Sequence, residues 1–384
     1  MVGDDDEVIQ IKRSYLIKYY RDSMKILHII NSLHTGGAEK LLADSIPIYK
    51  QREIDVELLL LNGDETPFYK QLKSKKTTIY TLTNGSIKKV YNPFLIFQII
   101  PYLKKYDVIH VHLFPALYWV ALAKWLSGSK TKLVFTEHST DNQRIKKGGV
   151  WRKADKFIYK QYDKIGTISV GVHNAIKAHL SDHSSKFQVI NNGIDILKYE
   201  NAIVYSKDGS LKTLIQVAGF RVQKDQPTLI RALQFLPKNV IVQFVGDGEK
   251  RKECEQMVEA LNLSDRVSFS GIRIDVPELL KSADIVVMSS HWEGFGLAAA
   301  EGMAAGKPTI ASDVAGLREV VSGAGLLFEK GNEKDLADKI ISLLDDDELY
   351  KKVAQQCFER AKQYDIKTMV DEYIELYNEI LNSE

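Results

Sequence analysis

Residues 284–314 read DIVVMSSHWEGFGLAAAEGMAAGKPTIASDV. One apolar run ends at Ser290, and a second run, PTIASDV, begins at Pro308. Between the two lie a loop that contains Gly294 and Gly296 and a stretch of small residues that suits a short helix. Because a helix that joins two apolar strands is the repeating unit of a parallel sheet, this stretch predicts an α/β fold.

The same alternation of apolar runs and longer amphipathic stretches extends along the chain on both sides. In the first half the runs are KILHIIN (25–31), VELLLLN (56–62), TIYTL (78–82), DVIHVHLF (107–114), KLVFTEH (132–138), KIGTIS (164–169) and FQVINNG (187–193). In the second half they are LIQVAGF (214–220), VIVQFVG (240–246), RVSFSG (266–271), DIVVMSS (284–290), PTIASDV (308–314) and GLLFEKG (325–331). Runs that are apolar throughout are typical of parallel strands buried on both faces. The alternation predicts two doubly wound, Rossmann-like units, which bind ligands beyond the carboxyl ends of their strands.

Length and composition agree with two domains. The chain has 384 residues, which at roughly 150 residues per domain is too long for one core. Hydrophobic residues make up 45% and charged residues 27%, as in ordinary soluble proteins. The longest apolar stretch, residues 95–103, is far shorter than the ~20 residues of a membrane helix. Cys254 and Cys357 cannot form a secreted disulfide framework, so we expect reduced thiols and a cytoplasmic protein.

The alternation of apolar runs and amphipathic stretches also predicts where the domains begin and end. We expect residues 1–23, which lack an apolar signal core, to be an N-terminal extension or tag remnant. The first Rossmann-like domain should span 24–199 and the second 200–366, joined by the polar stretch 196–211. Residues 367–384 should form a C-terminal helix that packs back toward the first domain.

Charge is distributed unevenly between the two halves. The net charge is only +2, but residues 1–200 hold 30 basic and 20 acidic side chains, and residues 201–384 hold 22 and 30. The first half should therefore meet something anionic. Nucleic acid is not favoured, because the sequence contains no zinc-ligand set, aromatic RNA-binding motif or basic zipper.

Gly36 and Gly37 follow the first strand and begin an amphipathic stretch. Glycines let a ligand approach the backbone closely, and the amides at a helix N-terminus favour phosphate. A purely structural turn explains the pair equally well. The three spaced glycines of the dinucleotide fingerprint are missing, which argues against a dinucleotide-dependent oxidoreductase.

Three histidines lie on predicted strands. His110 and His112 point to the same face and could share a metal ion, but no third ligand is evident, so we favour a packed or hydrogen-bonded pair. His138 ends its strand on the side where ligands bind, and we take it as a functional candidate.

Two glutamates accompany the glycine loop. Glu293 stands in the loop and Glu301 on the following helix, with seven residues between them. Loop amides can hold an anionic group while carboxylates accept hydrogen bonds from hydroxyls, a combination that suits a molecule with both phosphate and sugar. A glycine-rich turn with two solvated glutamates is the simpler alternative.

The segment EGFGLAAAE (293–301) resembles the signature of the family-four retaining glycosyltransferases, in which two glutamates are separated by seven residues. The resemblance covers nearly the whole chain from Met24. Its other motifs, in order, are GGAE (36–39), DVIHVH (107–112), the strand-ending His138, VINNGID (189–195), QKD (223–225), VGDGEKRKE (245–253) and SGIRIDVPELLKSADIVV (270–287). The resemblance implies the GT-B fold, in which two facing Rossmann-like domains hold the active site in the cleft between them.

The resemblance also implies roles for individual residues on the donor side. Glu301 should bind the ribose of the nucleotide, and Glu293 should lie beside the transferred sugar. Lys224 should neutralise the leaving diphosphate, Arg273 should lie near the nucleobase, and His138 should touch the donor sugar.

The glycine loops complete the implied donor site. The amides of Gly294, Phe295 and Gly296 should face the sugar and diphosphate, which Gly36 and Gly37 should approach from the acceptor-side domain. One position departs from the family: its usual diphosphate arginine falls here on Gly219. Arg221 could reach the same diphosphate from a shifted origin.

The activity implied is retaining transfer of a sugar from a nucleoside-diphosphate sugar to a glycan or lipid-linked acceptor in cell-surface polysaccharide synthesis. Fixed cations can replace a metal at the diphosphate, and no metal-binding DxD motif is evident at a strand end, so we expect metal-independent transfer without a cofactor. The alternatives are a nucleotide-sugar 2-epimerase of the same fold, a non-catalytic sugar-binding subunit, or Glu293 acting as a covalent nucleophile.

A basic stretch suggests contact with a membrane. Eight bases between residues 144 and 164 face only Asp155 and Asp163. The bases are Arg144, Lys146, Lys147, Arg152, Lys153, Lys156, Lys160 and Lys164. Trp151 follows two glycines among them, which fits peripheral docking on the anionic inner face of a membrane; a merely solvated basic surface is the alternative.

Overall fold

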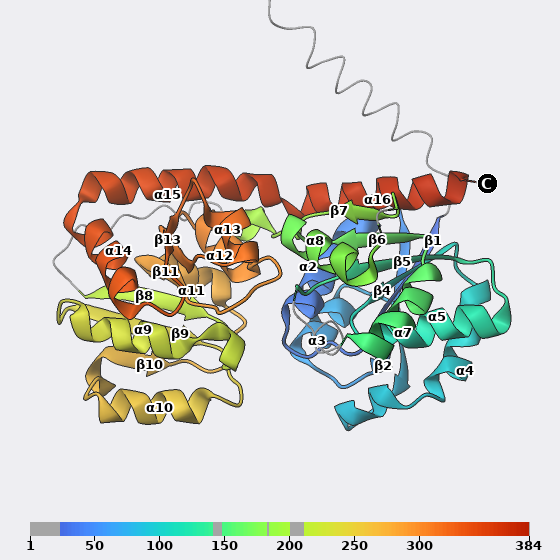
Figure 1. The fold of residues 1–384 in the computed structure, drawn as a ribbon, viewed down its shortest axis with the longest axis horizontal. Helices are drawn as coiled ribbons and strands as arrows, with labels where there is room; N and C mark the ends of the chain where they lie inside the picture. Colours follow the sequence, from blue (N-terminus) through green and yellow to red (C-terminus); the bar gives the residue numbers. More distant parts are fainter. Residues whose placement is uncertain (1–23, 141–147, 183, 200–210, 384) are drawn as a thin grey trace, which may run out of the picture. The chain divides into compact units, whose positions relative to one another are not determined.

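The computed structural model describes residues 24–140, 148–182, 184–199 and 211–383 (Figure 1). The expected extension 1–23 and most of the expected linker 196–211 lie outside these residues. The chain divides into two compact units. Unit 1 comprises Met1–Thr136, Phe157–Ile165 and Val370–Glu384, and unit 2 comprises Glu137–Lys156 and Gly166–Met369. The domain bounds expected from the sequence stay predictions.

The first sheet has seven strands in the order β3-β2-β1-β4-β5-β6-β7. The strands are β1 (Lys25–Ile30), β2 (Asp55–Asn62), β3 (Ile79–Thr83), β4 (Val108–His112), β5 (Lys132–Glu137), β6 (Lys164–Thr167) and β7 (Phe187–Val189). The helices between them are α2 (Gly37–Gln51), α3 (Pro67–Ser74), α4 (Leu95–Ile99), α5 (Ala116–Ser127), α7 (Gly149–Lys160) and α8 (Val170–Leu180). Every apolar run of the first half became a strand, because each offers side chains that can be buried on both faces.

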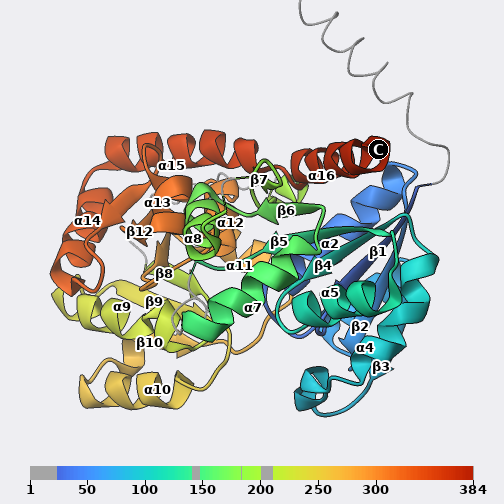
Figure 2. The same ribbon diagram turned by 45° about the vertical axis from the view of Figure 1, so that its right-hand side comes forward.

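The second sheet has six strands in the order β10-β9-β8-β11-β12-β13. The strands are β8 (Lys212–Val217), β9 (Val240–Val245), β10 (Val267–Phe269), β11 (Ile285–Met288), β12 (Thr309–Ser312) and β13 (Leu326–Phe328). The helices are α9 (Gln226–Ala232), α10 (Arg251–Ala260), α11 (Val276–Ser282), α12 (Leu297–Ala304), α13 (Ala315–Val321), α14 (Glu333–Asp345) and α15 (Asp347–Ala361). Helices pack on both faces of each sheet (Figures 1 and 2), so the predicted pair of Rossmann-like folds is confirmed.

The strand order places the switch points of both sheets. β1 pairs with β2 on one side and β4 on the other, and β8 pairs with β9 and β11, all in parallel. At a switch point, the connections that follow two neighbouring strands run in opposite directions. The loops at the carboxyl ends of these strands therefore separate and leave room for a ligand. Residues that follow β8 and β11 are therefore well placed for binding in unit 2.

The last helix, α16 (Ile366–Asn382), contributes two buried tyrosines to unit 1. The Tyr377 hydroxyl lies 2.6 Å from His110 Nδ1, and the Tyr373 hydroxyl lies 2.7 Å from Thr136 Oγ1. These contacts fasten the end of the chain to strands β4 and β5. Among the described residues, no helix is both long enough and apolar enough to cross a membrane.

Candidate functional site

The loop between β11 and α12 depends on its two glycines. Gly296 has φ +100°, a conformation that residues with a side chain rarely adopt, and it stands at the N-terminus of α12. Gly294 has an ordinary φ but no room, because a Cβ there would lie 2.5 Å from the carbonyl oxygen of His138. The Ser169 hydroxyl donates a hydrogen bond of 2.7 Å to the Gly294 carbonyl. The loop is therefore held against the residues that follow β5 and β6.

Lys224 and Glu293 meet at the switch point of unit 2. Lys224 ends a short 3₁₀ turn, residues 222–224, after β8, and its ammonium pairs with the Glu293 carboxylate in the loop after β11. The Ser290 hydroxyl also donates to Glu293 Oε1, at 3.1 Å. Glu293 is only 7% exposed, so these two contacts replace much of the hydration that its side chain loses on burial.

Hydrogen bonds fix the backbone beneath this ion pair. The Ser289 hydroxyl lies 2.7 Å from the Asp225 carbonyl oxygen, to which it donates. The Gln216 side-chain amide donates to the Lys224 carbonyl at 2.9 Å, and the His291 N–H donates to the Gln223 carbonyl at 2.8 Å. The ends of β8 and β11 are thus tied together, which holds the lysine at a fixed position.

His138, which follows β5 and whose backbone lies against Gly294, carries a neutral imidazole. Loss of hydration lowers the pKa of His138 to about 4, so the ring is uncharged at neutral pH. A neutral ring offers one donor and one acceptor, which suits a hydroxylated ligand better than an anion. His138 is thus the member of this group whose chemistry fits a sugar.

The other predicted donor-side residues are placed differently. Glu301 is buried on α12, and Phe295 is buried with its ring centre 5.1 Å from that of Tyr364. Arg221 is exposed at the start of the 3₁₀ turn. Arg273 is exposed and pairs with Asp275, its Nε lying 2.7 Å from Oδ1. The structure therefore brings Lys224, Glu293, Gly294 and His138 together, and it gives Arg273 an acidic partner of its own.

Gly36 and Gly37 lie in unit 1, at the N-terminus of α2. Gly36 is extended, and the Glu39 side chain folds over it, so that a Cβ at Gly36 would lie 2.3 Å from Glu39 Oε2. A carboxylate thus occupies the space where the sequence predicted a diphosphate to approach. An anion that approached Gly36 would have to displace this side chain.

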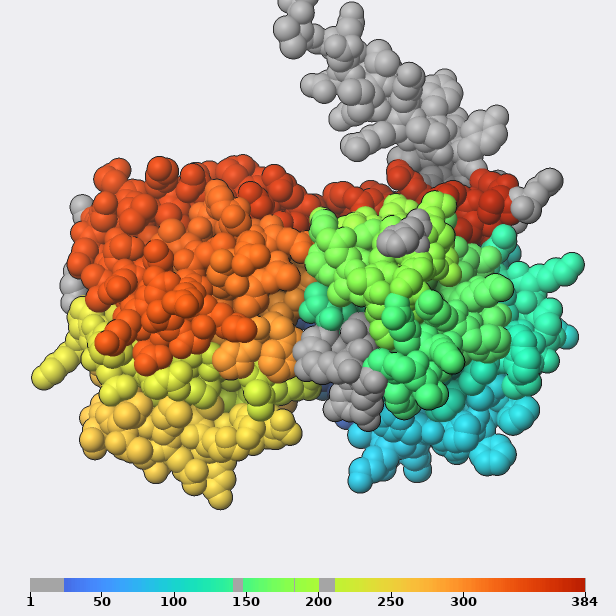
Figure 3. Space-filling view, in the orientation of Figure 1, coloured from blue at the N-terminus to red at the C-terminus, as the bar shows by residue number. Residues whose placement is uncertain are grey.

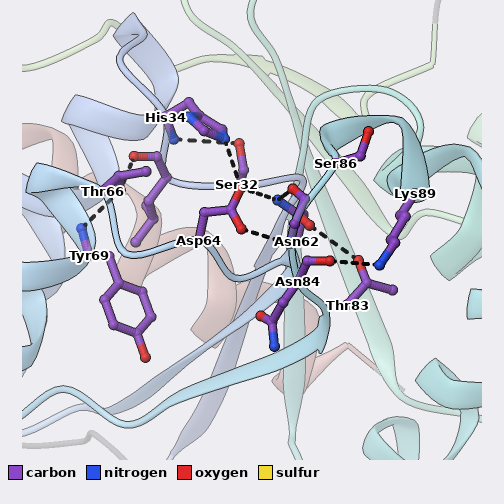
Figure 4. Close-up of polar contacts among 12 residues, drawn as sticks. Ser32, His34, Asn62, Asp64, Thr66, Tyr69, Thr83, Asn84, Ser86 and Lys89 are labelled. Carbon is purple, nitrogen blue, oxygen red and sulfur yellow. Dashed lines mark hydrogen bonds and ion pairs between the residues drawn. The ribbon is translucent and has the colours of Figure 1, made fainter.

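Unit 1 has a polar hollow that the sequence did not indicate. Figure 4 shows Asp64, Tyr69 and Asn84, three of the residues that line it. It lies at the carboxyl ends of β2 and β3, has a volume of about 380 Å³, and is lined by Gly63, Asp64, Glu65, Tyr69, Thr81 and Asn84. The signal that could have found it is the polar stretch Asn62–Gly63–Asp64–Glu65, which directly follows an apolar strand. Carboxylates, an amide and an aromatic ring together suit a ligand rich in hydroxyls.

A frame of hydrogen bonds fixes Asp64 in the wall of this hollow. Its Oδ1 accepts from the Gly85 N–H at 2.8 Å, and its Oδ2 accepts from the Asn62 side-chain amide at 2.9 Å. His34 Nε2 lies 3.5 Å from Oδ2. The Gly85 N–H holds the pKa of Asp64 below its usual range, so the carboxylate stays charged.

The histidine pair of β4 has a third member, which the sequence analysis missed. His28 on β1 lies in register with His110, and the three rings of His28, His110 and His112 are buried with ligand atoms within 4.8 Å of one another. His28 Nδ1 lies 3.0 Å from His112 Nε2, whereas the two ring nitrogens of His110 contact the hydroxyls of Tyr377 and Thr136. The rings therefore form a hydrogen-bonded cluster in the core.

Two family models match most of the chain. The model described as Glycosyltransferase Family 4 matches residues 35–197, and the model described as Glycosyl transferases group 1 matches residues 200–360. They meet near the stretch that separates the two runs of strands.

Relatives and solved structures resemble the chain over most of its length. The N-acetyl-alpha-D-glucosaminyl L-malate synthase of Bacillus anthracis is 28% identical, across 83% of this chain and 93% of its own. The N-acetylgalactosamine-N,N'-diacetylbacillosaminyl-diphospho-undecaprenol 4-alpha-N-acetylgalactosaminyltransferase of Campylobacter jejuni is 26% identical, across 88% and 94%. The crystal structure of Anabaena HepE in complex with UDP-glucose has a TM-score of 0.81 and 25% identity, across 93% of this chain and 100% of that one. The chain therefore belongs to the family-four, group 1 glycosyltransferases and has their GT-B fold.

Proposed function

We propose that the protein moves a sugar from a nucleoside-diphosphate sugar to a glycan or lipid-linked acceptor, with retention of configuration, in cell-surface polysaccharide synthesis. The pairing of Lys224 with Glu293 at the switch point of unit 2 carries this proposal. This pair places a cation and a carboxylate beside the backbone amides of Gly294–Gly296, which can face a diphosphate. Two similar proteins support the substrate classes: HepE was crystallised with UDP-glucose, and the Campylobacter enzyme is named for a diphospho-undecaprenol acceptor.

The donor reaction proposed here needs no metal ion. The bond between the sugar carbon and the diphosphate oxygen breaks, and Lys224 with the amides of Gly294–Gly296 stabilises the charge that develops on the diphosphate. The acceptor oxygen forms its bond to the same face of the sugar, which retains the configuration. The acceptor proton passes to the departing phosphate, so no enzymic base is required.

Glu293 acts in this proposal as a hydrogen-bond acceptor for the sugar and not as a nucleophile. Its carboxylate is already paired with Lys224 and accepts from Ser290, contacts that lower its reactivity toward carbon. Arg221, which is exposed, serves as a second cation for the diphosphate. Glu301 binds the ribose, and Arg273 reaches the nucleobase once it leaves Asp275.

The hollow of unit 1 is proposed to hold the acceptor. Asp64 and Glu65 would repel a dicarboxylate such as malate, whereas they accept hydrogen bonds from sugar hydroxyls. The preferred acceptor is therefore a neutral glycan end, either free or attached to a lipid.

Peripheral contact with a membrane is part of the proposal. Exposed Lys153, Lys156 and Lys160 of α7 support it, together with Trp151 and Phe157, which are about two-fifths exposed. Arg144, Lys146 and Lys147 of the same basic stretch lie outside the described residues.

The test is to incubate the purified protein with radiolabelled nucleoside-diphosphate sugars and a bacterial lipid extract. Label in the lipid phase would support the proposal if NMR of the product also shows that the α or β configuration of the donor sugar is preserved. Release of free nucleotide together with an altered sugar, without any acceptor, would indicate a 2-epimerase. Binding without turnover would indicate a non-catalytic subunit.

A further inference from the structure

We infer that unit 1 docks on an anionic phospholipid bilayer through the segment Ile87–Lys105, which we call the aromatic–lysine surface. It consists of two 3₁₀ turns, η1 (Ile87–Tyr91) and η2 (Ile100–Lys104), on either side of α4. Its exposed large apolar and basic members are Ile87, Lys88, Lys89, Tyr91, Phe94, Phe97, Lys104 and Lys105. This inference deepens the proposed peripheral contact, because it assigns that contact chiefly to a surface other than α7.

Large apolar side chains gather on this surface. Phe94 is 69% exposed, Phe97 61%, Tyr91 57% and Ile87 43%. Single exposed apolar residues are normal in soluble proteins, but four within one short segment form a patch that calls for a partner. Phe94 and Phe97 lie three residues apart, so they point to the same side of the helical turn.

The exposure does not come from loose packing of the segment. Val90, Leu95, Ile99 and Leu103 alternate with the exposed residues and are at most 2% exposed, so the inner side of the segment is already part of the core. The Trp119 indole N–H donates to the Val90 carbonyl at 2.7 Å, which fixes η1. The outer side is therefore a stable surface that stays apolar.

The charge of the aromatic–lysine surface indicates an anionic partner. Between Gly85 and Asp107 the chain has no acidic residue, and lysines stand at both ends of the apolar patch. Within the part of the chain that the structure describes, none of Lys88, Lys89, Lys104 and Lys105 forms an ion pair. Aromatic rings between lysines are typical of segments that lie in a bilayer interface, where the rings enter the headgroup layer and the ammonium groups meet lipid phosphates.

The surface adjoins the polar hollow of unit 1. Asn84 lines the hollow, and η1 begins three residues later. The Lys89 ammonium donates to the Asn84 carbonyl at 2.8 Å, as Figure 4 shows. The segment belongs to the light blue and cyan surface in Figure 3. A bilayer docked on it lies beside the hollow that we propose for the acceptor, which suits an acceptor that is anchored in lipid.

The test is sedimentation of the full-length protein with vesicles of phosphatidylcholine alone and of phosphatidylcholine with about one-third phosphatidylglycerol. We expect binding to the anionic vesicles that weakens as salt rises. The double variant Phe94→Ser with Phe97→Ser should lower vesicle partitioning by about tenfold or more, since the apolar anchor is lost. Lys88→Gln with Lys104→Gln should weaken binding to the anionic vesicles only.

A matched control removes equally exposed apolar side chains elsewhere. Phe235→Ser with Ile274→Ser changes two such residues in unit 2 and should leave partitioning unchanged. Circular dichroism verifies that each variant is folded. Transfer to a water-soluble acceptor should survive in the Phe94/Phe97 variant, which separates a failure of docking from a failure of the proposed function.

Three outcomes would overturn the inference. The first is equal partitioning of the wild type and the Phe94/Phe97 variant. The second is loss of binding only when Arg152 and Lys153 of α7 become Ser, which would place the contact on α7. The third is a concentration-dependent dimer that disappears in the Phe94/Phe97 variant, which would make the surface an interface between two copies of the chain.

Discussion

The Lys224 ammonium is paired with the Glu293 carboxylate, although 69 residues of chain separate them. The pair joins the loops that follow β8 and β11, the two neighbouring strands at the switch point of unit 2. Each charge is thus neutralised before any donor arrives. In the proposed reaction a donor diphosphate competes with Glu293 for the lysine, and the lysine follows the negative charge as it moves onto the leaving group.

We predict that Lys224→Ala lowers the turnover number by about 10²–10³-fold while changing the apparent affinity for the donor much less. Charge on the diphosphate grows as the glycosidic bond breaks, and groups directed at developing charge act mainly in the transition state. Steady-state kinetics with the donor varied measures both constants. Lys238→Ala, at an exposed site, is the control.

The same substitution also leaves the buried Glu293 carboxylate without its cation. Lys224→Ala combined with Glu293→Gln removes that unpaired charge. If the double variant regained most of the wild-type rate, the loss in the single variant would come from the stranded carboxylate, and the assigned role of Lys224 would be wrong. We expect no such recovery.

Glu301→Gln should weaken binding of the nucleotide without unfolding unit 2. As a carboxylate Glu301 should accept hydrogen bonds from the ribose, each worth ~1.5–3 kcal/mol, and the isosteric amide keeps the volume of this buried side chain. Calorimetric titration with the nucleoside diphosphate measures the change. Glu278→Gln, on the exposed side of α11, should bind like the wild type. Unchanged affinity in the Glu301 variant would contradict the ribose assignment.

Gly294→Ala should destabilise the protein and abolish turnover. The added Cβ would lie 2.5 Å from the His138 carbonyl oxygen, closer than side chains approach backbone, so the loop must move. Overpacking of this kind costs about 1–3 kcal/mol. Gly219→Ala is the matched control, because a Cβ there would meet the Asp247 carbonyl oxygen at an ordinary 3.4 Å. Equal melting temperatures for the two variants would show that the loop has room to yield.

Features encoded locally were predictable from the sequence. Strands appear where apolar runs are continuous, and the EGFG loop forms where two glycines precede small residues, because both depend on neighbours in the chain. The family motifs also predicted that candidate residues would follow the central strands of unit 2. The assignment of chemical roles to those residues stays a prediction.

Features assembled from distant segments were not predictable. The hollow of unit 1 combines residues after β2 and β3, and His28 reaches His110 only through the register of β1 with β4. No short pattern specifies such neighbours, because pairing between strands is decided by the whole sheet. The position of the Glu39 carboxylate over Gly36 was likewise not predictable, because the rotamer of a side chain depends on how its surroundings pack.

Chelation should leave turnover essentially unchanged. In the proposed reaction Lys224, Arg221 and the loop amides supply the positive potential that a magnesium ion supplies in other transferases. The measurement is the initial rate in excess EDTA, compared with the rate after Mg²⁺ or Mn²⁺ is added back. A rate that falls on chelation and returns with either ion would contradict transfer without a metal.

Stability should fall as the pH drops below about 6.5, and His28 should account for a definable part of the loss. Burial lowers the pKa of His28 to about 3, and its Nε2 makes no hydrogen bond within the described structure. The ring thus stays neutral in the folded protein down to about pH 3, whereas the unfolded chain binds a proton below ~6.5. The unfolded state then holds more protons, so the free energy of unfolding is greatest above pH 6.5 and declines between pH 6.5 and 3. Between pH 7 and pH 5 the expected loss from His28 is about 2 kcal/mol. His138, with its pKa lowered to about 4, adds a similar decline over a shorter range of pH.

Urea unfolding of the wild type and of His28→Gln at pH 7 and pH 5 measures the contribution of His28, with His34→Gln as a control for loss of an exposed histidine. Parallel pH curves for the wild type and His28→Gln would mean that the buried ring accepts a proton in the folded protein, and the core cluster would then have to supply an acceptor for it.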